Sequence, residues 1–353
     1  MNKIPKLLFL FTIILLSFNC QRGDGTSAIP LRDFQEQYDT DIVDIEDYLK
    51  GHSFTVVNNP GSADDQNVIF TKIPEGDTTT PSVWDSPLLQ TWVATYDEVD
   101  YTIYYLKLRE GGGSVNDKPS PTNVDAILTS YSGSYIFHFT DPDTQVEELR
   151  TFEFETVPFP QANLSLEGVI RGWREIFPKF KAGDIVTSEG EPINYSNFGA
   201  GVMFLPSGMG YYNASQSAIP AYSPLIFSFK LYEVTRLDQD GDGIPSYLED
   251  LNGDGYIKLI EEGTVNPDDT DGDLAPDYLD LDDDGDFFLT KVEIQRPMLN
   301  PNDPNEIKTY YPYNGAAVDD PLTPYDDRLG IPDCSGNYTD PLRIRKHLDP
   351  DCH

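Results

Sequence analysis

The residues best suited to chemistry are closely spaced acidic side chains in the last third of the chain. Asp238, Asp240 and Asp242 alternate with single residues, Gly243 follows at the sixth position, and Glu249 is the twelfth residue of the run. Oxygen ligands at positions 1, 3, 5 and 12, with glycine at 6, form the spacing that folds a 12-residue loop around Ca²⁺. This run therefore predicts a calcium loop.

The alternation of acidic residues occurs four times in succession. The second run is complete, whereas the third and fourth have Leu274 and Phe287 at the sixth position in place of glycine. Hard cations with many oxygen ligands explain why carboxylates lie so close together, so structural calcium is the expected cofactor. The predicted ligands are Asp238, Asp240, Asp242 and Glu249 in loop 1, Asp250, Asn252, Asp254 and Glu261 in loop 2, Asp269, Asp271, Asp273 and Asp280 in loop 3, and Asp282, Asp284, Asp286 and Glu293 in loop 4.

Loop 1 runs directly into loop 2, which leaves no room for flanking helices. The segment thus resembles thrombospondin type 3 repeats more than paired EF-hands, and the resemblance implies that calcium is a structural element. A disordered acidic linker is the alternative. A linker would not need the apolar residues that recur here, which are Ile244, Leu248, Ile257, Ile260, Tyr278 and Leu279.

The whole chain has more acidic than basic residues, and the excess is largest in these loops. The chain has 353 residues, with 60 Asp and Glu against 24 Lys and Arg and a formal net charge of −36. From Asp238 to Glu293, 19 residues are acidic, and only Lys258 and Lys291 are basic. Binding nucleic acid requires clustered cationic side chains, so nucleic acid is excluded as a partner.

A second set of residues is apolar and aromatic, and its order along the chain carries the information. Residues 168–173 read Gly-Val-Ile-Arg-Gly-Trp, and the amphipathic stretch that follows, ended by Gly183, predicts a short helix. A strand-like run then reaches Pro206-Ser207 shortly before Tyr211. Ile219-Pro220 precedes a final strand with alternating apolar positions.

This order resembles the second half of the FKBP-type peptidyl-prolyl cis-trans isomerases. An upstream run with Tyr131, followed two residues later by Gly133, resembles the second strand of that family. The resemblance implies an α+β domain, with an antiparallel sheet wrapped on a short helix, that binds proline-containing polypeptides. It also implies a pocket with Trp173 as its floor, in which the Ile170 N–H and the Tyr211 hydroxyl hold substrate carbonyls. The implied walls are Tyr131, Val169, Ile170, Ile219 and Phe227.

An alternative is that this apolar set is only the core of a β-sheet. The chain also departs from the family in three places. The family's Phe-Asp pair is expected after the second strand, where the chain offers Phe137, Phe139 and Asp141. Tyr212 stands where glycine is common, and it is strained if its φ is positive. Residues 185–201 form an insertion that we expect beside the pocket, where it could shape or cover the substrate groove.

The N-terminus has the layout of a secretory signal. Lys3 and Lys6 precede an apolar run, residues 7–16, that is too short to span a bilayer. Cys20 follows and leads into polar residues, which resembles a bacterial lipoprotein signal in which Cys20 becomes the lipidated first residue. An ordinary cleaved signal with an incidental cysteine is the alternative. The expected location is the bacterial cell envelope, on its periplasmic or surface face, with the lipid as membrane anchor.

Cys334 and Cys352 are the other two cysteines. In an exported chain such an even pair predicts a disulfide. Two free thiols or an adventitious metal site are alternatives that suit an oxidising compartment less well.

The predicted function is a peptidyl-prolyl cis-trans isomerase that assists the folding of exported proteins. The alternative is an FKBP-fold module that has lost turnover and serves as a binding or adhesion module on a calcium-stiffened stalk. The chain divides into five predicted segments. These are a signal peptide (1–19), a tether and N-terminal extension (20–97), an FKBP-like isomerase domain (98–236), calcium-binding repeats (237–295) and an irregular C-terminal tail (296–353).

Overall fold

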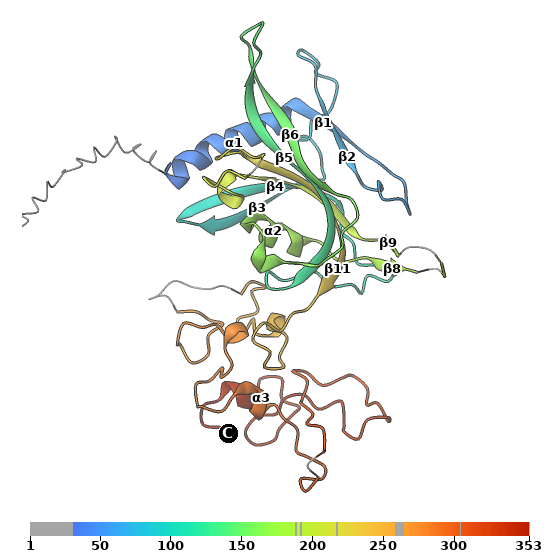
Figure 1. Ribbon diagram of the computed structural model, residues 1–353, viewed down its shortest axis with the longest axis vertical. Helices are drawn as coiled ribbons and strands as arrows, with labels where there is room; N and C mark the ends of the chain where they lie inside the picture. The colour runs from blue at the N-terminus through green and yellow to red at the C-terminus, as the bar shows by residue number, and fades with distance from the viewer. Residues whose placement is uncertain are drawn as a thin grey trace, which may run out of the picture.

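The computed structural model describes residues 31–187, 189–190, 193–216, 218–257, 265–303 and 305–352. The predicted signal peptide, the predicted lipidation site Cys20 and the loop 2 ligand Glu261 lie outside these residues. The described chain forms a sheet lobe, residues 31–236, and a loop lobe, residues 237–352, whose regular elements are short (Figure 1). Within the described ranges, no helix has both the length and the apolar character needed to cross a membrane.

The sheet lobe is built on one antiparallel sheet. Its seven strands run in the order β3-β4-β10-β11-β5-β6, with β7 beside β5. The sheet curves around helix α2, Arg171–Ile176 (Figure 1). The expected α+β class with an antiparallel sheet and few helices is confirmed. The strand bounds are β3 Leu89–Tyr96, β4 Val99–Arg109, β5 Ala126–Thr140, β6 Glu147–Val157, β7 Leu164–Ser165, β10 Gly199–Leu205 and β11 Leu225–Thr235.

Both faces of the central strands are covered, which explains why β10 is buried at all seven positions. Met203 and Leu205 belong to the hydrophobic core beneath α2, whereas Val202 and Phe204 belong to a second core beneath helix α1, Phe34–Gly51. The alternation follows because successive side chains of a strand point to opposite faces of the sheet.

Helix α1 is capped by one carboxylate and tied to the sheet lobe by another. Asp33 accepts two backbone N–H groups of the first turn at 3.0 and 3.1 Å, as an N-cap residue does. Asp41 is buried and accepts the N–H of Ser207 at 2.7 Å and its hydroxyl at 2.5 Å. Burial raises the pKa of Asp41 to about 6, and the hydrogen bonds from Ser207 oppose that rise. Helix α1 therefore holds the 3₁₀ turn η3, Ser207–Met209, that leads to Tyr211.

Two small hairpins lie outside the main sheet. Strand β1, His52–Val56, pairs with β2, Val68–Lys72, and β8, Asp184–Val186, pairs with β9, Asn194–Ser196. The domain boundary predicted at residue 98 lies inside the β3–β4 hairpin. Strand β3 therefore belongs to the sheet and not to an N-terminal extension.

Helix α2 is shorter than predicted. It ends at Ile176 and continues only as the 3₁₀ turn η2, Phe177–Lys179, because Pro178 has no N–H to donate to a preceding turn. Gly183 does not end this helix. A Cβ at Gly183 would lie 2.6 Å from the carbonyl oxygen of Ser196, so this glycine permits the close approach of β9.

The loop lobe contains the acidic loops and the tail packed on one another. Ile244 and Ile294 from the loops share one core cluster with Tyr311 and Ile331 from the tail. The tail, predicted as a separate irregular segment, therefore forms one unit with the loops. Its short elements are the 3₁₀ turns η4 Ser246–Leu248, η5 Asp277–Leu279 and η6 Lys346–Leu348, and helix α3 Thr290–Glu293.

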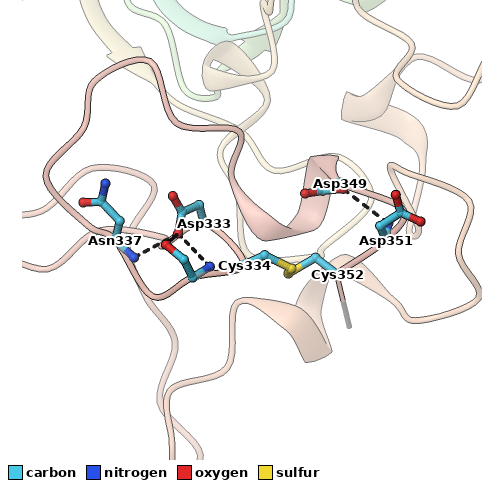
Figure 2. The surroundings of a disulfide bond; sticks show 7 residues. Asp333, Cys334, Asn337, Asp349, Asp351 and Cys352 are labelled. Carbon is cyan, nitrogen blue, oxygen red and sulfur yellow. Dashed lines mark hydrogen bonds between the residues drawn. A yellow bond between two sulfur atoms is a disulfide. The ribbon is translucent and has the colours of Figure 1, made fainter.

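A disulfide joins Cys334 and Cys352, whose Cα atoms are 5.5 Å apart (Figure 2). Beside it the Asp333 carboxylate accepts the N–H of Asn337 at 2.9 Å. The cross-link closes the end of the tail.

The two lobes meet in a small interface. Val124 of the sheet lobe packs in one cluster with Ile257 and Tyr278 of the loop lobe. The Tyr278 hydroxyl donates to Glu167 at 2.7 Å, and the Gln239 side-chain amide donates to the Val124 carbonyl at 2.7 Å. Glu167 lies in the 3₁₀ turn η1, Leu166–Gly168, so the loop lobe contacts the segment that leads into α2.

Candidate functional site

A pocket of about 220 Å³ opens beside α2. Strands β5, β6 and β11, the segment from β7 to α2 and the turn after η3 contribute to it. It therefore draws its walls from segments far apart in the sequence. The lining residues are Tyr131, Glu155, Leu164, Gly168, Val169, Ile170, Trp173, Tyr211 and Phe227.

Trp173 occupies the centre of this aromatic group. Its side chain is 4% exposed, and its ring lies 4.9 Å from that of Tyr131 and 5.2 Å from that of Phe227, both nearly perpendicular. The preceding Gly172 lies against β10, since a Cβ there would come within 2.4 Å of Leu205 Cδ2. Gly172 therefore allows helix α2 to lie directly on strand β10, and the Trp173 ring fills the space beside this contact.

One wall of the pocket is fixed by a hydrogen bond. The Tyr131 hydroxyl donates to Glu155 Oε2 at 2.9 Å. Burial, followed by this bond and the charge of Glu155, raises the pKa of Tyr131 above its usual range. The tyrosine therefore stays a neutral donor at every physiological pH.

A β-bulge in strand β6 changes the direction of the Phe154 and Glu155 side chains. Glu155 pairs with Gly133 and Glu153 pairs with Ser134, so Phe154 is an extra residue on β6. Bulges of this kind re-aim side chains. Here Glu155 lines the pocket, and the Phe154 ring packs on that of Phe227 with centroids 5.7 Å apart. A Cβ at Gly133 would lie 2.5 Å from the Phe154 ring, so only glycine leaves room for it.

Three hydrogen-bond donors of the pocket have no partner among the described residues. These are the Trp173 indole N–H, which is buried, the Ile170 backbone N–H at the N-cap of α2, and the Tyr211 hydroxyl. Burial, and then the charge of Glu155, raises the pKa of Tyr211. The pocket thus offers neutral donors around an apolar floor.

The structure brings together six of the seven predicted pocket residues, which are Tyr131, Val169, Ile170, Trp173, Tyr211 and Phe227. The seventh, Ile219, does not line the pocket. It is 5% exposed and packs in the core cluster that contains Trp173 and Phe227.

The Phe-Asp pair expected after the second strand lies elsewhere. Asp141 is in the β5–β6 turn, where it accepts two backbone N–H groups at 2.9 Å. Phe139 packs its ring under the Arg150 guanidinium at 3.7 Å. Glu155 lines the pocket instead, and the ring of the adjacent Phe154 packs on that of Phe227 with centroids 5.7 Å apart. The Phe-Glu pair in the following strand was the corresponding signal in the sequence.

Tyr212 has the positive φ that we expected to strain it. Its φ is 49°, in the left-handed region that favours glycine. Its ring stacks on Phe34 with centroids 4.4 Å apart, and its hydroxyl donates to the Arg32 carbonyl. The start of α1 therefore holds this turn in place.

None of the described residues of the insertion at 185–201 lines the pocket. Its β8–β9 hairpin contributes Val186, Ile193 and Tyr195 to a different depression, which it shares with residues 158–161. The expectation that it shapes the substrate groove is corrected accordingly.

The four acidic loops share one pattern of hydrogen bonds. The first-position carboxylate accepts the N–H five residues on at 3.2, 2.8, 3.1 and 3.0 Å in loops 1 to 4. The fifth-position carboxylate accepts the N–H two residues on at 2.6, 2.8, 2.8 and 2.7 Å. Each loop therefore curls around its own carboxylates, as a calcium loop must.

The sixth position has the same backbone conformation in every loop. Gly243 and Gly255 have φ of 110° and 81°, and Leu274 and Phe287 have φ of 86° and 74°. A residue with a Cβ is strained in this region, by about 1–3 kcal/mol. Loops 3 and 4 therefore keep the loop geometry in spite of lacking the glycine.

The carboxylates form groups close enough to share an ion. Ca²⁺ binds oxygens at about 2.3–2.6 Å, so two of its ligands lie no more than about 5 Å apart. In the described chain, no twelfth-position residue lies in one group with all of the first-, third- and fifth-position carboxylates of its own loop. Glu249, the twelfth residue of loop 1, lies instead in a group with Asp242 of the same loop and Asp283 of loop 4. The groups whose oxygens lie within 4.8 Å of one another are Asp238, Asp240 and Asp242; Asp242, Glu249 and Asp283; Asp269, Asp271 and Asp273; and Asp282, Asp284 and Asp286.

Several of these carboxylates are buried without a partner. Both oxygens of Glu249, Asp283 and Glu293 lack a hydrogen-bond partner among the described residues. Burial, and then neighbouring carboxylates, raises the pKa of Glu249 to about 10, that of Asp283 to about 11 and that of Glu293 to about 8. Buried unpaired carboxylates are costly, and a hard divalent cation is the group that fits this all-oxygen donor set.

Comparisons with known proteins give one family match and several structural likenesses. Residues 239–325, which include most of the acidic loops and part of the tail, match the family model described as BamM C-terminal. A search of curated proteins finds no match.

Three solved structures are similar to part of this chain. A peptidyl-prolyl cis-trans isomerase from Pseudomonas syringae pv. tomato is 20% identical, with a TM-score of 0.28, over 43% of this chain and 84% of its own. FkpA from Escherichia coli is 23% identical, with a TM-score of 0.26, over 40% of this chain and about half, 51%, of its own. The N-terminal domain of FKBP42 from Arabidopsis thaliana is 10% identical, with a TM-score of 0.26, over 42% of this chain and 96% of its own. These TM-scores are low, and the three likenesses carry no conclusion about function.

Proposed function

We propose that the chain is a peptidyl-prolyl cis-trans isomerase that acts on proline-containing polypeptides in the Trp173 pocket. The observation that carries the proposal is an aromatic pocket of about 220 Å³ in which three hydrogen-bond donors have no partner among the described residues. A pocket of this kind needs no nucleophile or proton transfer to act on a prolyl bond.

The reaction explains why such a pocket is sufficient. A peptide bond rotates over a barrier of about 18–20 kcal/mol, and a prolyl bond takes tens to hundreds of seconds without help. A usual turnover of about 10–1000 per second requires lowering the barrier by about 4–7 kcal/mol. The planar amide is dipolar through resonance, and the twisted amide is less so. An apolar site therefore favours the transition state over the ground state.

Each residue then has a defined part. Trp173 forms the floor under the proline ring, between Tyr131 and Phe227. The Ile170 N–H and the Tyr211 hydroxyl donate to substrate carbonyls on either side of the twisting bond. Glu155 holds Tyr131 in place through the hydroxyl hydrogen bond.

The decisive experiment measures isomerisation of a peptide with an apolar residue before proline, with the full chain as catalyst. Tyr211→Phe removes one hydroxyl and should lower kcat/KM by about 2–10-fold, the usual worth of one hydrogen bond. Tyr195→Phe is the matched control, because its hydroxyl donates to Glu233 at 2.7 Å outside the pocket. A folded wild-type chain that gives no acceleration would refute the proposal and favour a binding module.

We also propose that the four acidic loops bind calcium as a structural ion. The supporting observations are the shared loop geometry and the buried oxygens of Glu249, Asp283 and Glu293 that have no hydrogen-bond partner among the described residues. The chain's own residues would supply first-, third- and fifth-position oxygens, and the ion would supply the positive charge that offsets them.

We further propose that the chain is exported and anchored in the bacterial cell envelope by lipid on Cys20. The Cys334–Cys352 disulfide supports export, because disulfides persist in oxidising compartments. Cys20→Ala should move the protein from the membrane fraction to the soluble fraction. An unchanged distribution would rule out the lipid anchor.

A further inference from the structure

A group of buried carboxylates joins the first acidic loop to the last. Asp242 and Glu249 belong to loop 1, Asp283 belongs to loop 4, and one oxygen of each lies within 4.8 Å of the other two. Their side chains are 0%, 2% and 2% exposed. Three carboxylates held this close and away from water can all be ionised only beside a compensating positive charge.

No cationic group among the described residues forms a hydrogen bond or an ion pair with these three carboxylates. Asp242 Oδ2, both oxygens of Glu249 and both oxygens of Asp283 have no hydrogen-bond partner there. Lys291 is the only basic residue of loop 4, and its ammonium group donates to the Gly241 carbonyl at 2.6 Å. The donor set is therefore composed of oxygens alone, which is the set that hard divalent cations prefer.

Packing between the loops brings these residues together. Ile244 of loop 1 and Ile294, directly after loop 4, lie in one core cluster. A Cβ at Gly243 would lie 3.1 Å from Ile294 Cδ1, so the two loops are in direct contact. The position of Asp283 beside loop 1 thus results from tertiary contact and not from the spacing within its own loop.

The backbone N–H of the second residue bonds to the ninth residue of its own loop in loops 1, 3 and 4, but the side chains at the second position differ. In loop 3 the Thr270 hydroxyl donates to Asp277 at 2.8 Å, and in loop 1 the Ser246 hydroxyl donates to Gln239. Both contacts stay within one loop. Asp283 is the second residue of loop 4, and its carboxylate lies with loop 1 instead.

We propose that Asp242, Glu249 and Asp283 bind a divalent cation of the calcium class that links loop 1 to loop 4. The inference rests on the proposed calcium binding by the loops and adds a ligand, Asp283, that the loop spacing does not predict. Asp242 also belongs to the group with Asp238 and Asp240, so it contributes to two adjacent sites. The ion holds the two ends of the acidic segment together.

The test uses the full chain and Ca²⁺ alone as probe. Bound calcium per chain is counted by titration against a chelator of known affinity for wild type, Asp283→Asn and Asp351→Asn. Asp351 is exposed near the disulfide, so its variant removes the same charge without touching the site (Figure 2). Asp283→Asn should bind one ion fewer than wild type, and Asp351→Asn should bind the same number.

Limited proteolysis gives a second readout, in which the expected effect of Asp283→Asn on the cleavage rate differs between chelator and Ca²⁺. With chelator, Asp283→Asn should be cleaved in the loop lobe no faster than wild type, because it replaces a buried carboxyl group whose oxygens have no hydrogen-bond partner among the described residues. With Ca²⁺ it should be cleaved faster, because the link between the loops is lost. A purely structural role of Asp283 would weaken the lobe in both conditions and would overturn the inference.

The outcomes separate this inference from the proposed calcium binding. Wild type that binds no calcium refutes the broader proposal together with this one. Wild type that binds calcium, with an equal count in Asp283→Asn, overturns only the link between loops 1 and 4. If Asp283→Asn does not fold, the smaller uncharged variant Asp283→Ser takes its place. The proposal then requires that Asp283→Ser binds one calcium ion fewer than wild type.

Discussion

The Tyr131 hydroxyl donates a hydrogen bond to Glu155 at 2.9 Å across strands β5 and β6. The two residues are diagonal neighbours, because Tyr131 pairs with Val157 and Glu155 pairs with Gly133. Diagonal neighbours on one face of an antiparallel pair are within reach of long side chains. This bond fixes the orientation of the Tyr131 ring against Trp173.

Removing the acceptor should loosen the pocket wall. Glu155→Ala should lower kcat/KM for prolyl isomerisation by about 2–10-fold, whereas Glu155→Gln should retain most activity because its amide oxygen still accepts. Glu153→Ala is the matched control, since Glu153 is an exposed residue of the same strand that pairs with Ser134. Equal loss in Glu155→Gln and Glu155→Ala would show that the charge, and not the hydrogen bond, matters.

Calcium removal should unfold the loop lobe selectively. Without the ion the carboxylates repel one another, and short apolar residues cannot bury enough area to offset that repulsion and the chain entropy. Chelation should expose residues 238–293 to proteases while the sheet lobe stays folded, as circular dichroism can show. Asp242→Asn combined with Asp254→Asn should imitate chelation. Identical cleavage patterns with and without chelator would exclude calcium as the organising ion.

Relieving backbone strain at the sixth position should stabilise the loop lobe. Phe287 has φ of 74° and is 94% exposed, so Phe287→Gly loses little packing. We expect a gain of about 1 kcal/mol in the free energy of unfolding of the calcium-loaded lobe. Phe288→Gly is the control, because Phe288 is not among the residues of positive φ and should lose stability. A loss in both variants would contradict strain at Phe287.

Asp41 should make the sheet lobe less stable as pH rises. Burial raises the pKa of Asp41 to about 6 in the folded chain, above the usual value for aspartate. Between about pH 4 and pH 6 the folded state therefore binds more protons than the unfolded state, and stability falls as pH rises through this window. We expect the free energy of unfolding of wild type, relative to Asp41→Asn, to fall by about 2–3 kcal/mol across it. Parallel pH profiles of the two proteins would refute the assignment.

Local motifs in the sequence predicted much of the pocket. Gly172-Trp173 and the Tyr131-x-Gly133 run depend on close contacts that only glycine allows, so residue type and spacing are enough to recognise them. Helix α1 is encoded locally in a different way, because its apolar residues Phe34, Tyr38, Ile42, Ile45 and Leu49 recur at helical spacing. The α+β class with an antiparallel sheet was expected from the resemblance to the FKBP-type family, and the sheet topology confirms it.

The tertiary structure alone decided which distant residues complete each site. Phe154 and Glu155 are adjacent in sequence, and a regular strand would place them on opposite faces. Only the bulge in β6 lets Glu155 line the pocket while Phe154 packs on Phe227. Asp283 reaches Glu249 because packing of Ile244 against Ile294 joins two loops that lie far apart in the chain. Register and packing between remote segments depend on the whole folded chain, and no local spacing encodes them.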